Sequence, residues 1–144
     1  MISGVTNGGA IPVLERMVQF AGQRQRLLAN NIANLSTPDF RPVDVSVADF
    51  QENLSEAIDE RRLQTGPRRN ELPLKGTRQV EVHENSLTLK AQPAGDNILF
   101  HDGNDRDLDR TMQDLVENFM AFRTAAQFMR KQFESIRTAI SGRI

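Results

Sequence analysis

The chain has 144 residues, of which 38% are hydrophobic and 26% charged, and its 18 basic and 19 acidic side chains leave a net charge of −1. This balance argues against a protein that binds nucleic acid mainly through charge. Because Cys is absent and His83 and His101 are the only histidines, disulfides, thiolate nucleophiles and multi-histidine or cysteine metal sites are excluded. The composition predicts one domain that is not an enzyme and holds no cofactor or metal.

No stretch of the sequence approaches the ~20 apolar residues that a membrane-spanning helix needs. The first nine residues also lack the basic start and the continuous apolar segment of a secretory signal peptide. We therefore expect a cytosolic protein, or one that leaves the cell by a route that reads no cleaved signal.

The first predicted element is a helix that ends near Leu35. Pro12 suits its first turn, and Thr37 is held out of the α conformation by Pro38. Its apolar residues recur at steps of three and four, the heptad pattern of a helix that packs along another helix. This stripe comprises Ile11, Leu14, Val18, Ala21, Leu28, Ile32 and Leu35, with Gln25 filling the one gap.

A polar run closes this helix. Asn30, Asn31 and Asn34 fall within five positions, although Asn is a mediocre helix former. Their amides can bond to the chain that turns back after Pro38, or to another subunit. The alternative is that Asn34 simply closes the helix and the other two are exposed.

The middle region, residues 36–106, differs in kind from the two ends. Residues 36–46 read as extended chain, and Ser46 caps a helix over about 46–62. We expect residues 63–79 to form a flexible loop, because they contain Pro, Gly and Arg without any period. A β-hairpin follows, built on Val80, Val82, Leu87 and Leu89 around the turn former Asn85-Ser86, and Ile98-Leu99-Phe100 is a candidate third strand.

Two charged stretches are candidate binding sites. The acidic run 102–109 has the wrong spacing for an EF-hand calcium loop, so it reads as a turn that enters a helix. The basic residues between 61 and 78 have no aromatic residues among them for base stacking. They read as a solvated loop or as the binding site of an acidic partner.

The last predicted element is a helix over 107–144 that repeats the heptad pattern. Its stripe comprises Leu108, Met112, Leu115, Phe119, Phe122, Ala126, Met129, Phe133, Ile136 and Ile140. Gly142 is placed for a C-cap. We expect the two terminal helices to pair as a coiled-coil-like stalk within a mainly α fold whose middle holds one short helix, a β-hairpin and loops. Such a stalk is narrow, so its outward faces need neighbouring subunits, and this favours an assembly protein.

Two segments carry a family resemblance. The run Ala29-Asn-Asn-Ile-Ala-Asn-x-x-Thr-Pro-x-Phe40-Arg41 resembles the N-terminal motif of the bacterial flagellar rod and hook (axial) proteins. The run Asp102-Gly-Asn-x-x-x-Leu108-Asp-x-x-Met112-x-x-Leu115-x-x-Asn118, with Ile136-Arg-Thr-Ala-Ile140, resembles the proximal rod members of that family, and the short chain fits them. One departure is Asp39, where many axial proteins have Gly.

The resemblance implies a structural subunit of the proximal rod, the drive shaft at the base of the flagellum. It implies export through the flagellar type III gate without a cleaved signal, a periplasmic place in the basal body, and transmission of torque. The implied partners are further copies, other rod proteins, a FliE-like adaptor, the membrane ring and the export gate, with no nucleic acid and no small-molecule substrate. The axial motif then supplies interface residues, namely Asn30, Asn31, Asn34, Thr37, Pro38 and Phe40. The alternative is a discrete coiled-coil adaptor or export chaperone.

Overall fold

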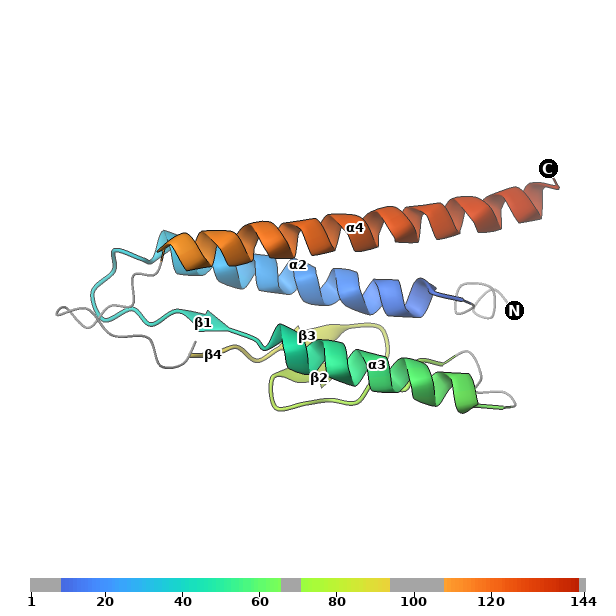
Figure 1. Ribbon diagram of the computed structural model, residues 1–144, viewed down its shortest axis with the longest axis horizontal. Coiled ribbons are helices and arrows are strands. Elements are labelled where there is room, and N and C mark those ends of the chain that lie inside the picture. Colours follow the sequence, from blue (N-terminus) through green and yellow to red (C-terminus); the bar gives the residue numbers. More distant parts are fainter. Residues whose placement is uncertain (1–8, 66–70, 94–107, 143–144) are drawn as a thin grey trace.

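The computed structural model describes residues 9–65, 71–93 and 108–142. Three helices run along the long axis in the described residues, and Figure 1 shows α2 lying between α4 on one side and α3 with the strands on the other. This confirms the predicted mainly α class with small antiparallel strands. In chain order the elements are α2 (Ile11–Ala33), β1 (Val43–Asp44), α3 (Val47–Leu63), β2 (Val80–Val82), β3 (Leu87–Leu89), β4 (Gln92–Pro93) and α4 (Leu108–Ser141).

The ends of the two long helices follow the predicted signals. Pro12 lies in the first turn of α2, and the helix ends at Ala33, two residues before the predicted Leu35. α4 ends at Ser141, and Gly142 follows with a φ of 63°, the left-handed conformation of a C-cap glycine. No helix among the described residues is long and apolar enough to cross a bilayer.

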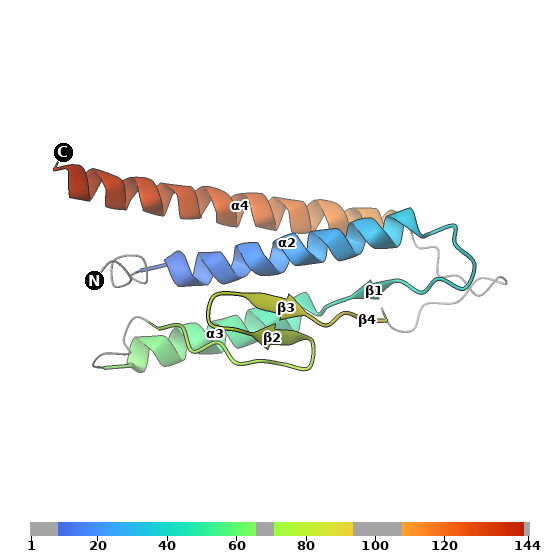
Figure 2. The same ribbon diagram turned by 180° about the vertical axis from the view of Figure 1, so that it is seen from behind.

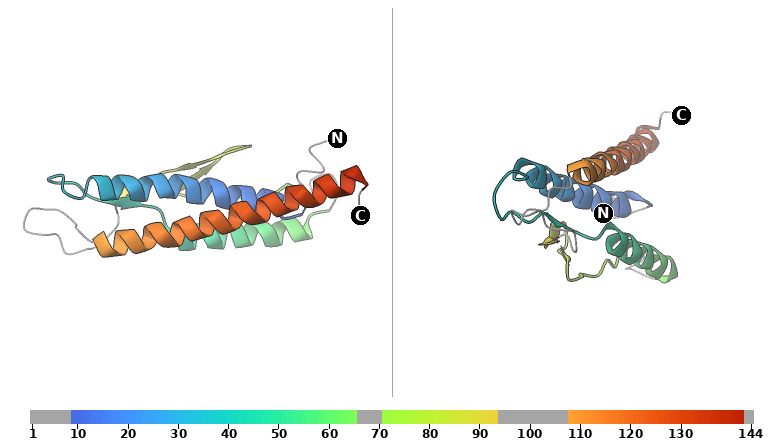
Figure 3. Two further views of the ribbon diagram at one scale, coloured as in Figure 1. Left: turned by 90° about the horizontal axis from the view of Figure 1, so that it is seen from above. Right: turned by 60° about the vertical axis from the view of Figure 1, so that its left-hand side comes forward.

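α2 and α4 lie side by side and antiparallel, as all views agree (Figures 1, 2 and 3). The approach is close, since a methyl group added at Gly22 would stand 3.5 Å from the ring of Phe122. The terminal helices are therefore adjacent, as predicted. A regular coiled-coil seam along both stripes stays a prediction.

The opposite face of α2 is covered by the middle region, so the expectation of a bare two-helix stalk is wrong for this helix. Phe20 stacks on Phe50 of α3 with ring centroids 3.9 Å apart and ring planes 6° from parallel. The buried core lies here and comprises Phe20, Val45, Phe50, Leu54, Ala57, Leu74, Val80 and Leu87. The reason is that α2 is apolar on two faces, whereas the heptad pattern predicts one apolar face.

The middle region matches the prediction in its helix and hairpin. The hydroxyl of Ser46 accepts a hydrogen bond of 3.1 Å from the backbone N–H of Asp49 and so caps α3. β2 and β3 form the predicted antiparallel hairpin, with Val80 opposite Leu89 and Val82 opposite Leu87. A second pair, β1 with β4, was not predicted.

Part of the predicted loop is docked. Within 71–79, Leu74 is buried in the core, so this stretch packs against α3 and the hairpin. Its apolar residues are too few to show a period, which is why the pattern suggested only a loop. The candidate strand Ile98-Leu99-Phe100 lies outside the described residues.

Candidate functional site

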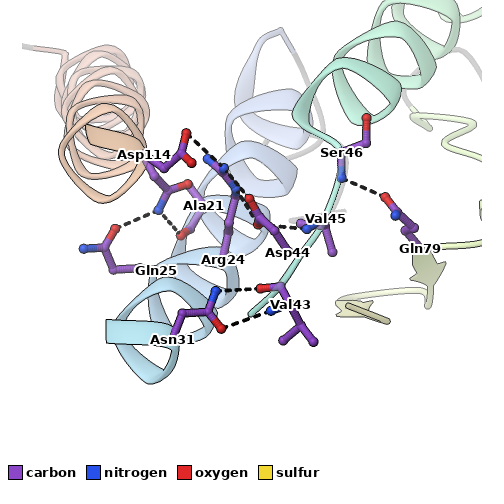
Figure 4. A network of polar contacts seen from close by, with 11 residues as sticks. Ala21, Arg24, Gln25, Asn31, Val43, Asp44, Val45, Ser46, Gln79 and Asp114 are labelled. Atoms are coloured by element: carbon purple, nitrogen blue, oxygen red, sulfur yellow. Dashed lines mark hydrogen bonds and ion pairs between the residues drawn. The ribbon is translucent and has the colours of Figure 1, made fainter. Parts of the chain in front are cut away.

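A polar network joins α4, α2 and the chain that leads into α3 (Figure 4). At its centre the guanidinium of Arg24 donates two hydrogen bonds to the carboxylate of Asp44, from Nε at 2.9 Å and from Nη2 at 2.6 Å. The same Nη2 lies 3.7 Å from a carboxylate oxygen of Asp114 on α4. Arg24 of α2 therefore binds one carboxylate from α4 and one from the chain that leads into α3.

Arg24 is 7% exposed, yet it remains charged. Burial opposes the charged form, but the hydrogen bonds and negative charge of Asp44, with a smaller contribution from Asp114, outweigh it. The pKa of Arg24 is therefore raised above its ordinary value. A buried ion pair adds little net stability over well-packed apolar residues, but removing one of its partners is costly.

Asn118 makes the second polar link between the terminal helices. Its amide nitrogen donates to the backbone oxygen of Ala21 at 2.8 Å and to the side-chain oxygen of Gln25 at 2.7 Å. Asn118 is 5% exposed, and Gln25 is the residue that fills the gap in the first stripe. The polar gap in one helix therefore faces a polar residue of the other, which favours one register between α2 and α4.

Asn31 holds the returning chain after the turn. Its amide nitrogen donates to the backbone oxygen of Val43 at 2.8 Å, and its amide oxygen accepts from the Val43 N–H at 3.1 Å. Asn31 is among the most buried side chains of the described residues. Of the two interpretations of the asparagines, the bond to the returning chain holds for Asn31.

Replacing Asn31 tests this contact. Asn31→Leu keeps the branched shape of the side chain but leaves both polar groups of Val43 without their bond, and the strand partner Pro93 has no N–H to offer. Each unsatisfied buried group costs about 1–3 kcal/mol, so we expect the free energy of unfolding to fall by about 2–4 kcal/mol in urea titrations. The exposed neighbour Asn30 is the control, and Asn30→Ala is expected to change it by less than about 1 kcal/mol. Equal losses from the two variants would contradict this role of Asn31.

The other members of the axial motif form the turn itself. Asn34 caps α2, and its amide donates to the backbone oxygen of Asn30 at 2.9 Å. The N–H of Thr37 bonds to the Asn34 oxygen, and the N–H of Phe40 bonds to the Thr37 oxygen. Asn30, Thr37 and Pro38 are exposed, so the helix-closing interpretation holds for Asn34. An interface role for these residues stays a prediction.

Among the described residues, Asp39 is the one residue other than glycine that has a positive φ, which is 60°. This explains why the departure from Gly is tolerated, since Asp enters the left-handed region more readily than most residues. We expect Asp39→Val to lower the free energy of unfolding by about 1–2 kcal/mol, because a β-branched residue is strained there. Asp39→Gly is expected to be neutral or slightly stabilising. Chemical denaturation of both variants checks this, and tolerance of Val would contradict it.

Only half of the predicted C-terminal stripe faces inward in the single chain. Five members of the stripe are half-buried, namely Leu115, Phe122, Ala126, Met129 and Ile136. The other five are exposed, namely Leu108, Met112, Phe119, Phe133 and Ile140. The buried positions of α4 are instead Asn118 and Ala125, each one residue before a stripe member. The face toward α2 is thus rotated by about one residue from the predicted stripe. In the first stripe, Ile11 and Leu28 are buried and Leu14, Val18 and Ile32 half-buried.

Exposed apolar surface is concentrated on α4. Eight of its large apolar side chains are between 38% and 76% exposed: Leu108, Met112, Val116, Phe119, Met120, Phe128, Phe133 and Ile140. Scattered apolar residues are normal on a protein surface, but so many large ones along one helix are typical of a surface that binds another protein.

A groove of about 580 Å³ runs over α2 between α4 and the start of α3. Phe20, Phe50 and Leu54 contribute its apolar lining, and Asp44 and Asp114 contribute carboxylates. Of the two histidines, His83 is exposed at the end of the hairpin and His101 lies outside the described residues. Among the described residues no three His, Cys, Asp or Glu side chains gather as a metal site.

Sequence reasoning missed Arg24, Asp44 and the burial of Asn118. Arg24 and Asp44 belong to different elements twenty positions apart, so no local pattern pairs them. A signal for Asn118 existed, because it is a polar residue one position before an apolar stripe member and within the quoted C-terminal motif.

Comparison with known proteins finds similarity along nearly the whole chain. The flagellar basal body rod protein FlgB of Bacillus subtilis (strain 168) is 24% identical over 134 residues, 93% of this chain and 95% of that protein. FlgB of Borrelia hermsii is 28% identical over 135 residues, 91% and 95% of the two chains. FlgB of Yersinia enterocolitica is 28% identical over 124 residues, 81% and 82% of the two chains. No protein-family model matches the chain.

These similarities confirm the resemblance to the flagellar axial proteins and narrow it to the rod proteins named FlgB. Matches to five such proteins each cover at least 81% of this chain. The similarity therefore includes the middle region as well as the two terminal motifs.

Proposed function

We propose that this chain is a structural subunit of the bacterial flagellar rod and that it polymerises through its paired terminal helices, in which α4 supplies the exposed surface. The observation that carries the proposal is the row of large apolar side chains that α4 leaves exposed. The similarity to flagellar basal body rod proteins over most of the chain supports the same role. A structural role needs no catalytic group, and the proposal assigns none.

α2 and α4 have different parts in this proposal. α2 is covered by α4 on one side and by the core of the middle region on the other, so it serves as the internal support. α4 has one covered face and one uncovered face, so it supplies the contacts between subunits. The side chains that we expect to form them are Met112, Phe119, Phe133 and Ile140, the exposed members of the predicted stripe.

The finer parts of the proposal rest on the family resemblance. They are a place in the proximal rod, within the periplasm, and contacts with other rod proteins, a FliE-like adaptor, the membrane ring and the export gate. Torque transmission is part of the same proposal, because a shaft needs many dry contacts shared among subunits. Interfaces of this kind are apolar at the centre, as the exposed face of α4 is.

Electron microscopy of basal bodies from a strain that lacks this chain tests the proposal. We expect membrane rings without a rod or hook, and restoration of both by the natural chain. A variant with Phe119→Ser and Phe133→Ser is expected to fold but not to restore rods, because both side chains are exposed in the single chain. Leu63→Ser is the control, since Leu63 is a large apolar side chain outside α4 that is 84% exposed.

Complete rods in the strain without the chain would overturn the proposal. The discrete coiled-coil adaptor or export chaperone would then be the better interpretation. Full restoration by the Phe119→Ser, Phe133→Ser variant would overturn the assignment of the α4 face while leaving the rod role intact.

A further inference from the structure

The uncovered face of α4 carries a second heptad row beside the one that meets α2. Its members step alternately by four and three: Met112, Val116, Phe119, Arg123, Ala126, Arg130, Phe133 and Arg137. The first three members of the row are apolar, and the remaining five include Arg123, Arg130 and Arg137, which we call the arginine row. These three side chains are exposed, and no ion pair of theirs is found among the described residues.

α3 presents carboxylates at the same spacing. Asp49, Glu52, Glu56 and Asp59, which we call the acidic row, are exposed on the side of α3 opposite its buried residues Phe50, Leu54 and Ala57. Asp59 pairs with Arg62, and the other three make no ion pair in the part of the chain that the structure describes. Asp49 and Glu56 are seven residues apart, as are Arg123 and Arg130. Charges therefore repeat at about 10 Å along both helices.

The two rows cannot meet within one chain, because α2 lies between α3 and α4 (Figure 1). Both helices nevertheless run in the same direction, and α3 lies beside the middle part of α4 along the long axis (Figures 1 and 2). A second copy placed beside the first, without reversal, would bring its acidic row to the arginine row.

We propose that the uncovered face of α4 binds α3 of a second copy of this chain, with the arginine row against the acidic row. The proposal rests on the proposed rod function and gives the side-by-side contact within it. Such a contact uses different surfaces on the two copies, so it is not limited to a dimer and continues as an open helical series. Met112, Val116, Phe119 and Phe133 supply apolar area, and the charges fix direction and stagger.

The charges are expected to determine orientation more than strength. Exposed ion pairs contribute little each and are screened by salt. Complementary rows nevertheless favour the correct pairing and disfavour a reversed one, in which arginines would face arginines. This predicts that assembly slows as salt is raised.

Cysteine cross-linking tests the contact directly, because the natural chain contains no Cys. A chain carrying Glu56→Cys and Arg130→Cys is expected, under mild oxidation in isolated basal bodies, to give a ladder of disulfide-linked multimers. A product that stops at the dimer would contradict a contact that uses different surfaces on the two copies. A product that stays monomeric would overturn the contact itself. Chains with only one of the two substitutions are the controls.

Charge reversal tests the chemistry and separates this proposal from the rod role. Glu52→Lys with Glu56→Lys, or Arg130→Glu with Arg137→Glu, is expected to lower the number of rods at least tenfold. The chain with all four substitutions is expected to restore them, because its rows are complementary again. Glu71→Lys with Glu84→Lys is the matched control, since these exposed acids lie outside α3.

The outcomes distinguish the two proposals. If the strain without the chain lacks rods but both reversed variants restore them, the rod role holds and this contact is wrong. If the fourfold variant fails although each reversed pair folds as the natural chain does by circular dichroism, the partner of these rows is not a second copy. Complete rods in the strain without the chain would overturn the rod role itself.

Discussion

Replacing Phe20 by Ala is expected to lower the free energy of unfolding by about 3–5 kcal/mol, the cost of a large cavity in a packed core. Phe20 is 4% exposed, it stacks on Phe50, and it joins α2 to the middle region. Part of this loss is the stacking itself, which adds about 0.5–1.5 kcal/mol beyond burial. Urea titration of the purified chain, followed by circular dichroism, measures the difference.

The matched variant is Phe133→Ala, which removes the same side chain from an exposed position on α4. We expect its free energy of unfolding to stay within about 1 kcal/mol of the natural chain, because Phe133 is 44% exposed and lies outside the buried core. We nevertheless expect Phe133→Ala to reduce rod assembly, although the fold of the single chain stays stable. A Phe133→Ala chain that unfolds as easily as Phe20→Ala would show that α4 is covered on this side.

The contrast between Phe20 and Phe133 shows what a heptad pattern can and cannot predict. Steps of three and four predicted the two long helices and their closeness, since helical spacing depends only on local geometry. The same pattern could not say which part of a wide apolar face meets the partner helix. In α4 the row toward α2 includes Asn118 and Ala125, a polar and a small residue, whereas Phe119 one position later is exposed. Tertiary packing, and not the hydrophobicity of each residue, selected the buried row.

The middle region was predictable where its signals were local. The Ser46 cap, the α3 period and the hairpin turn each depend on a few neighbouring residues. The docking of Leu74 and the pairing of β1 with β4 depend on residues far apart in sequence, which no local pattern reports. The same limit hid Arg24 and Asp44, while the asparagines after Ala29 were visible because they occur together.

The second large loss of stability is expected when the ion pair between Arg24 and Asp44 is broken. Asp44→Asn removes the negative charge but keeps the shape, so Arg24 is left buried with only Asp114 nearby at 3.7 Å. Breaking a buried pair by removing one partner costs about 3–5 kcal/mol, and we expect the lower part of that range because Asp114 remains. The loss is expected in the free energy of unfolding, together with weaker attachment of α3 to α2.

The exposed pair of Arg62 with Asp59 is the control for this experiment. Its two side chains are 74% and 66% exposed, so Asp59→Asn is expected to change the free energy of unfolding by less than about 1 kcal/mol. Similar losses from Asp44→Asn and Asp59→Asn would contradict a structural role for the buried pair.

The pH dependence of a second variant checks the charge of Arg24. A base whose pKa is raised in the folded state contributes stability that is fully present below its unfolded pKa. That contribution is lost only as the pH rises through the folded pKa, which for Arg24 lies above the already high ordinary value of arginine. The difference in unfolding free energy between the natural chain and Arg24→Met should therefore stay constant between about pH 6 and 9. A difference that shrinks within this window would mean that Arg24 loses its proton there, and that the carboxylates of Asp44 and Asp114 do not hold its charge.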